Sequence, residues 1–203
     1  NKPHLYKPEP VIYGMPASEM NSSEGDGVHP FSGVNPANGV VIYYDLGSSV
    51  PEGVVTLEVY DRSNKLITRL NSEADSTYIS YAGGPPAAQK LPTSKGLNRF
   101  VWDMHHPVMP GIPTAYIEAN YRGHKVIPGT YTLKLQVEDT VLETQATILE
   151  NPLMDTISDE QFASYDQFMS EVEKELTDMH QTVNGLADVH QQLLKLHEFV
   201  KKE

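Results

Sequence analysis

A strict alternation of apolar and polar residues runs through residues 129–137, whose sequence is GTYTLKLQV. Successive side chains of a β-strand point to opposite faces, so this pattern predicts a strand with one buried and one solvated face. One-faced strands are typical of antiparallel sheets. This feature constrains the fold most, and it predicts an inward-facing set made of Tyr131, Leu133, Leu135 and Val137.

Five other segments have strand-like patterns, which gives six or seven short strands within residues 35–150. The segments at 54–61 and 65–70 are separated by turn-forming residues and are predicted to pair as a hairpin. In the segment 96–104, Phe100 and Trp102 are expected on one face and Arg99 and Asp103 on the other. Two such sheets packed face to face make an antiparallel β-sandwich of immunoglobulin size. The remaining predicted strands lie at 39–46 and 140–149.

A change in composition near residue 151 marks the start of a predicted helix over residues 157–202. Ser158 followed by Gln161 is a capping-box signal. Apolar residues then recur at alternating intervals of three and four, which predicts one long amphipathic helix that continues through Asn184 and Gly185. The predicted seam consists of Phe162, Tyr165, Met169, Val172, Leu176, Met179, Val183, Leu186, His190, Leu193, His197 and Val200.

This seam is too large an apolar surface to remain in water, so the helix is expected to pack on a partner. The partner is expected to be either the surface of the β domain or a second chain. A homodimer through the helix is the favoured arrangement, because the heptad spacing suits knobs-into-holes packing. Protonation of His190 and His197 would put charge into the seam, so we expect association to weaken at acidic pH.

Charge and composition exclude several classes of partner. Residues 1–150 hold 16 acids and 11 bases, and residues 151–203 hold 11 acids and 4 bases. An acidic surface repels phosphate groups, so neither nucleic acid nor an anionic membrane is an expected partner. The chain has no cysteine, and no apolar run reaches the length of a membrane span. The expected organisation is an extended lead-in at 1–34, a β domain at 35–150 and a helical part at 151–203.

Five stretches, taken in order, resemble a known family: HLYKP from residue 4, NPANGVVIYYDL from residue 35, GLNRFVWDM, IPGTYTLKLQV and SDEQFASYDQF. The set resembles the region that follows the β-propeller in bacterial BNR/VPS10-type (sortilin-like) repeat proteins, often labelled glycosyl hydrolases. The β part is similar to the immunoglobulin-like domain of flagellar hook-capping proteins. The resemblance implies an upstream propeller outside this sequence and a periplasmic or extracellular location. It carries no site residue onto this chain.

The segment around Trp102 contains the residues that most resemble a catalytic or metal cluster. Trp102 itself is predicted to be a core residue, because it alternates with Phe100. Asp103, His105 and His106 lie close together, but adjacent residues of a strand face opposite sides, so we predict no catalytic and no metal-binding residue among them. The histidines of the helix, at 180, 190 and 197, lack the spacing of three or four that a metal site on one helix needs. No cofactor is expected.

Two long connections, at 71–96 and 104–125, are the best candidates for a binding role, because long loops in small domains are often functional. Their tyrosines could bind a carbohydrate or a protein. The candidate binding residues are Tyr78, Tyr81, Tyr116 and Tyr121.

The sequence therefore favours a non-catalytic accessory region that braces an upstream propeller and mediates association through its helix. One alternative is a carbohydrate- or protein-binding module that uses the tyrosine-bearing loops. Another is that these loops contribute residues to a hydrolase site on the propeller.

Overall fold

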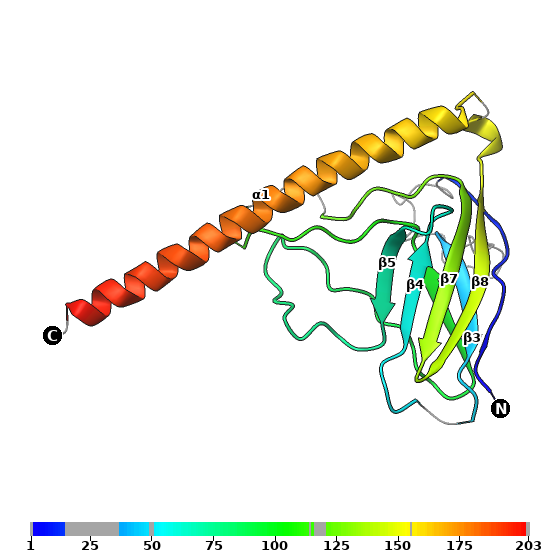
Figure 1. The fold of residues 1–203 in the computed structure, drawn as a ribbon, viewed down its shortest axis with the longest axis horizontal. Coiled ribbons are helices and arrows are strands. Elements are labelled where there is room, and N and C mark those ends of the chain that lie inside the picture. The colour runs from blue at the N-terminus through cyan, green and yellow to red at the C-terminus, as the bar shows by residue number, and fades with distance from the viewer. Residues whose placement is uncertain are drawn as a thin grey trace, which may run out of the picture.

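The computed structural model describes residues 2–14, 37–48, 51–113, 115, 121–154 and 156–201. Figure 1 shows a β domain followed by one long helix, α1 (Asp159–Val200), part of which extends well beyond the sheets. This confirms the predicted mostly-β fold with a C-terminal helix. The strands are β1 (His4–Leu5), β2 (Val11–Ile12), β3 (Val40–Asp45), β4 (Thr56–Tyr60), β5 (Leu66–Asn71), β6 (Leu97–Trp102), β7 (Gly129–Val137) and β8 (Thr140–Leu149), and a 3-10 turn, η2 (Pro152–Met154), precedes the helix.

The strands form two sheets, one of three strands in the order β1-β3-β6 and one of five in the order β2-β8-β7-β4-β5. The six longer strands are those that the alternation predicts, and β4 and β5 form the predicted antiparallel hairpin. The expectation of wholly antiparallel sheets is wrong at one edge, where β2 pairs in parallel with β8. A two-residue strand that arrives from outside the hairpins can take either direction, because no short turn fixes its orientation.

One hydrophobic core joins the two sheets. The apolar inward residues of β3, β4, β6 and β7 belong to this core, so the predicted burial pattern is confirmed on both sheets. Cross-strand register keeps apolar pairs together, since Val40 lies opposite Trp102 and Ile42 lies opposite Phe100. Each pair adds packing across a sheet face.

Trp102 lies within this core, with 2% of its surface exposed. Its ring meets that of Tyr131 edge-on, with 5.5 Å between centroids. The Tyr131 hydroxyl donates a hydrogen bond of 2.7 Å to the carbonyl of Ile127. Both aromatic residues therefore have the packing role that the sequence predicts.

Helix α1 is continuous through Asn184 and Gly185, as predicted. Ser158 Oγ accepts a hydrogen bond from the Gln161 backbone N–H, and Gln161 accepts one from the Ser158 N–H, so both halves of the capping box are present. The first half of α1 contacts the β domain, whereas every residue from Gly185 to Val200 is exposed. No helix among the described residues is long and apolar enough to cross a membrane.

Candidate functional site

The connection between β6 and β7 carries the candidate site, because its two arms pair with each other. Three backbone hydrogen bonds join the arms: Val126 N–H to Met104 O at 2.8 Å, His106 N–H to His124 O at 2.9 Å and Met109 N–H to Tyr121 O at 2.7 Å. An isolated antiparallel bridge links His105 with Lys125. We call residues 104–109 together with 121–126 the ribbon.

The ribbon places the side chains of His106 and His124 against each other. Their rings stack with centroids 4.1 Å apart and an interplanar angle of 13°. Gly123 makes this approach feasible, because a Cβ there would lie 2.7 Å from both the Cβ and the backbone oxygen of His106. The position is therefore restricted to glycine by contact distance rather than by backbone conformation.

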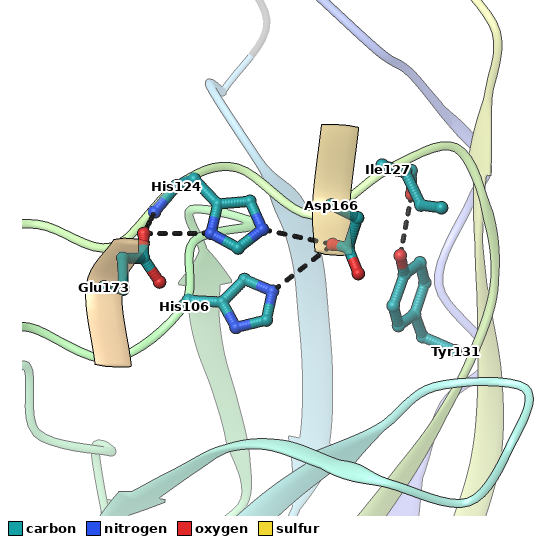
Figure 2. A network of polar contacts seen from close by, with 6 residues as sticks. All are labelled: His106, His124, Ile127, Tyr131, Asp166 and Glu173. Atoms are coloured by element: carbon teal, nitrogen blue, oxygen red, sulfur yellow. Dashed lines mark hydrogen bonds and ion pairs between the residues drawn. The ribbon is translucent and has the colours of Figure 1, made fainter. Parts of the chain in front are cut away.

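Helix α1 brings two carboxylates to this histidine pair (Figure 2). Asp166 Oδ1 lies 3.1 Å from His124 Nε2, and Glu173 Oε1 lies 2.9 Å from His124 Nδ1. Glu173 also accepts a short hydrogen bond from the backbone N–H of His124. Asp166 and Glu173 are seven residues apart, so they lie on one face of the helix about two turns apart and hold the imidazole between them.

The charges of this four-residue cluster follow from its donors and acceptors. An ionised carboxylate only accepts hydrogen bonds, and a neutral imidazole donates only one. His124 can therefore donate a hydrogen bond to each of the two carboxylates only when it is protonated to an imidazolium. Burial alone would lower the pKa of His124, but the hydrogen bonds to Asp166 and Glu173 outweigh burial and raise it. The His106 and His124 imidazoles hold the pKa of Asp166 well below its usual range.

His106 is held less completely than His124. Its Nε2 lies 3.7 Å from Asp166 Oδ1, an ion-pair distance that is too long for a hydrogen bond. That nitrogen is buried and has no hydrogen-bond partner among the described residues. The side chains of His124 and His106 are 1% and 10% exposed, so the cluster is enclosed. Three ligand atoms, one each from His106, His124 and Glu173, lie within 4.8 Å of one another, and these residues could hold a metal ion.

The same helix face makes further contacts with the β domain on either side of the cluster. At one end the ring of Phe162 meets Tyr13, with 5.7 Å between centroids. At the other end His180 Nδ1 lies 2.7 Å from Pro110 O, and the Asn184 side-chain amide donates to Gly111 O at 2.8 Å. Helix α1 is therefore fastened by polar contacts along this face as well as by the ring contact of Phe162.

Asp103, His105 and His106 do not come together at one site. His105 Nδ1 lies 2.8 Å from the backbone oxygen of Asp103, while His106 faces the helix. The expectation that the adjacent histidines diverge is thus correct. What the sequence reasoning missed is the second arm of the ribbon and the helix carboxylates, which give His106 three different neighbours: His124, Asp166 and Glu173.

The four tyrosines proposed as binding residues do not share one environment. Tyr78 is partly exposed, and its hydroxyl donates to Pro85 O at 2.9 Å. Tyr81 packs against Gly84 and Gly111, where a Cβ on either glycine would clash with its ring or hydroxyl. Tyr121 is buried at 3% exposure, with its ring against His180. Tyr116 lies outside the described residues.

A cavity lies between the two long connections. Its volume is about 530 Å³, and it is lined by residues that include Tyr78, Pro85, Trp102, Asp103 and Arg122. Of the three proposed tyrosines that the structure describes, only Tyr78 lines this cavity. The role of these tyrosines in binding stays a prediction.

Comparisons of the chain with protein-family models, with curated proteins and with solved structures find no match.

Proposed function

We propose that this chain is a non-catalytic accessory module that associates with a second copy of itself through the free face of α1. The observation that carries the proposal is the exposed apolar stripe along this helix. Its members are Phe168, Met179, Leu186, Val189, Leu193, Leu196 and Val200, each at least 50% exposed.

The helix has two faces, and only one is used within the chain. Phe162, Asp166, Glu173 and His180 form the face that contacts the β domain. The stripe lies on the other side of the helix, and beyond Gly185 nothing in the described chain covers it. An apolar surface of this length in a water-soluble domain marks an interaction site.

Spacing and charge favour a second copy as the occupant. Positions 186, 189, 193, 196 and 200 follow the alternating three–four spacing of a coiled-coil seam, and all five are leucine or valine. The sequence from residue 186 onward is also balanced in charge, although the rest of the helix is strongly acidic. Two copies could therefore meet there with little repulsion: Asp188, Glu198 and Glu203 are matched by Lys195, Lys201 and Lys202.

The immunoglobulin-like sandwich is part of this proposal. Three features support such a sandwich: the two sheets share one core, the tryptophan is buried, and the Tyr131 hydroxyl donates a hydrogen bond to a carbonyl four residues earlier. The sequence resemblance to propeller-containing repeat proteins, often labelled glycosyl hydrolases, supports a role in bracing an upstream propeller, in the periplasm or outside the cell.

Analytical ultracentrifugation of the full 203-residue chain tests the association. We expect a concentration-dependent dimer. Leu193→Glu should weaken it by at least about 100-fold, because an unpaired charge would enter the seam. Gln191→Glu adds the same charge to the same helical turn but off the stripe, and it should leave the dimer intact. A wild-type chain that stays monomeric up to about 1 mM would overturn the proposal.

The cavity between the long connections supports a second candidate function, binding of a glycan. The lining of the cavity includes Trp102 as well as Tyr78. The indole N–H of Trp102 is buried and has no acceptor among the described residues. A sugar hydroxyl could accept from such a donor. Calorimetric titration with oligosaccharides tests it: Tyr78→Ala should reduce binding at least tenfold, whereas exposed Tyr43→Ala should not. Flat titrations with the wild-type chain would exclude this candidate.

A further inference from the structure

The cluster at the junction of the ribbon and α1 contains more potential metal-ligand atoms than docking of the helix requires. Two imidazoles and two carboxylates meet in an enclosed space, and they come from two ribbon arms and one helix. We propose that His106, His124 and Glu173 bind a divalent transition-metal ion such as Zn²⁺, and that this ion fastens α1 to the β domain. The inference does not rest on the proposed self-association.

The ligand geometry is close to that of a metal site. The three ligating atoms lie within 4.8 Å of one another. In a tetrahedral zinc site with bonds of about 2.0 Å, two ligand atoms are separated by about 3.3 Å. To bring the three ligand atoms to this separation, the side chains have to move by on the order of 1 Å and the two stacked rings have to tilt. These are movements of side chains alone, because the ribbon and the helix already bring the three residues together.

Asp166 completes the arrangement from the other side of the histidine pair. Figure 2 shows the Nε2 atoms of His106 and His124 directed toward Asp166, with Glu173 beyond the opposite ring edge. Imidazoles that bind a metal through one nitrogen commonly donate the other N–H to a carboxylate, which fixes the tautomer. An Nε2–H directed to Asp166 would leave the Nδ1 lone pairs for the metal, on the side where Glu173 lies. Asp166 is thus a positioning residue.

A dication also resolves the charge and hydrogen-bonding problems of this enclosed cluster. Two ionised carboxylates need positive charge nearby, and buried charges are stable only when they are paired or coordinate a metal. Zn²⁺ with Glu173 and Asp166 would make the site neutral while both histidines stay neutral. Metal binding through Nδ1 would also place the His106 proton on Nε2, the buried nitrogen that lies 3.7 Å from Asp166 Oδ1.

The ligand types select the class of ion. Calcium and magnesium prefer sites made entirely of oxygen ligands, whereas imidazole nitrogens suit zinc and its first-row neighbours. Two histidines and one glutamate form a known zinc-binding set that leaves a fourth position for water. A surface groove of about 360 Å³, lined in part by His106 and Glu173, gives water access to that position.

Zinc titration of the chelator-treated full chain by isothermal calorimetry tests the inference. We expect one equivalent of Zn²⁺ to bind and to raise the melting temperature. His106→Ala and Glu173→Gln should weaken binding by more than 100-fold, and Asp166→Asn by about 10- to 100-fold. His105→Ala is the matched control, because His105 neighbours the cluster yet faces Asp103, and it should bind Zn²⁺ as the wild type does.

Cobalt provides a second readout that needs no variant. Co²⁺ bound by two histidines and a carboxylate in tetrahedral geometry should give intense visible absorption, which added Zn²⁺ should abolish. Leu193→Glu should keep both signals, which separates a failure of this site from a failure of association. Absence of saturable Zn²⁺ and Co²⁺ binding in the wild type would overturn the inference. So would unchanged binding in both His106→Ala and Glu173→Gln.

Discussion

Truncation of Trp102 is the sharpest test of the shared core. An indole buries about 200 Å², which corresponds to about 5 kcal/mol of apolar burial as an upper value. The edge-on contact with Tyr131 adds about 0.5–1.5 kcal/mol. The surroundings relax around a lost side chain, so measured costs of such truncations fall near 3–5 kcal/mol. We expect Trp102→Ala to lower the free energy of unfolding by about 3–5 kcal/mol.

Trp102→Phe should cost far less. It keeps an aromatic ring against Tyr131 and loses about 1 kcal/mol of burial. It also removes an indole N–H that has no acceptor among the described residues, which offsets part of that loss. The expected cost is about 1 kcal/mol or less.

Urea denaturation followed by circular dichroism measures both Trp102 variants. Leu97→Ala is the control, because Leu97 lies on the same strand but is 59% exposed and should change stability by no more than about 0.5 kcal/mol. In the wild type, tryptophan emission should be blue-shifted and poorly quenched by iodide. If Trp102→Ala stays within about 1 kcal/mol of the wild type, or if iodide quenches the emission fully, the reasoning about the core is refuted.

Three further outcomes are expected. Tyr131→Phe should destabilise the chain by about 1 kcal/mol in urea denaturation, because the buried carbonyl that its hydroxyl bonds loses its donor; no change would mean that water replaces the hydroxyl. Ser158→Ala should reduce stability by about 0.5–2 kcal/mol through loss of the capping box, whereas Ser158→Asp should retain it. Sedimentation at about pH 8 and about pH 5.5 should give similar dimer fractions if the exposed stripe forms the dimer contact, because His190 and His197 then lie beside the contact and not within it. If the dimer instead weakens at acidic pH, as the sequence analysis expects, both histidines lie within the contact.

Local pattern was sufficient to predict most of the strands. Strands buried on one face show a two-residue period, and the six longer strands have it, so their positions and inward faces can be predicted from the sequence. The strands β1 and β2 could not be predicted in this way, because two residues define no period. The parallel pairing of β2 with β8 depends on where the lead-in passes the sheet, which no local pattern encodes.

The candidate site was only partly visible in the sequence. His106 stands out beside His105, but its neighbour His124 is brought to it by backbone pairing across a long connection. One signal was available on the helix: Asp166, Glu173 and His180 recur at seven-residue intervals beside the apolar seam. A polar heptad of this kind indicates a second contact face with polar partners, which the sequence analysis did not consider.

The two faces of α1 also explain how the helix can extend past the domain that holds it. Helices in globular proteins gain most of their stability from packing of an apolar face. Here the docked face after Phe162 includes polar contacts to ribbon imidazoles and loop carbonyls, and the exposed apolar stripe lies on the other side of the helix. Gly185, which costs a helix about 1 kcal/mol relative to alanine, lies where the described contacts with the β domain end. A Cβ there would meet nothing within 4 Å, so local packing does not explain the glycine. Since tertiary contacts within the described chain end at this point, the proposed second copy would stabilise the projecting segment by covering its stripe.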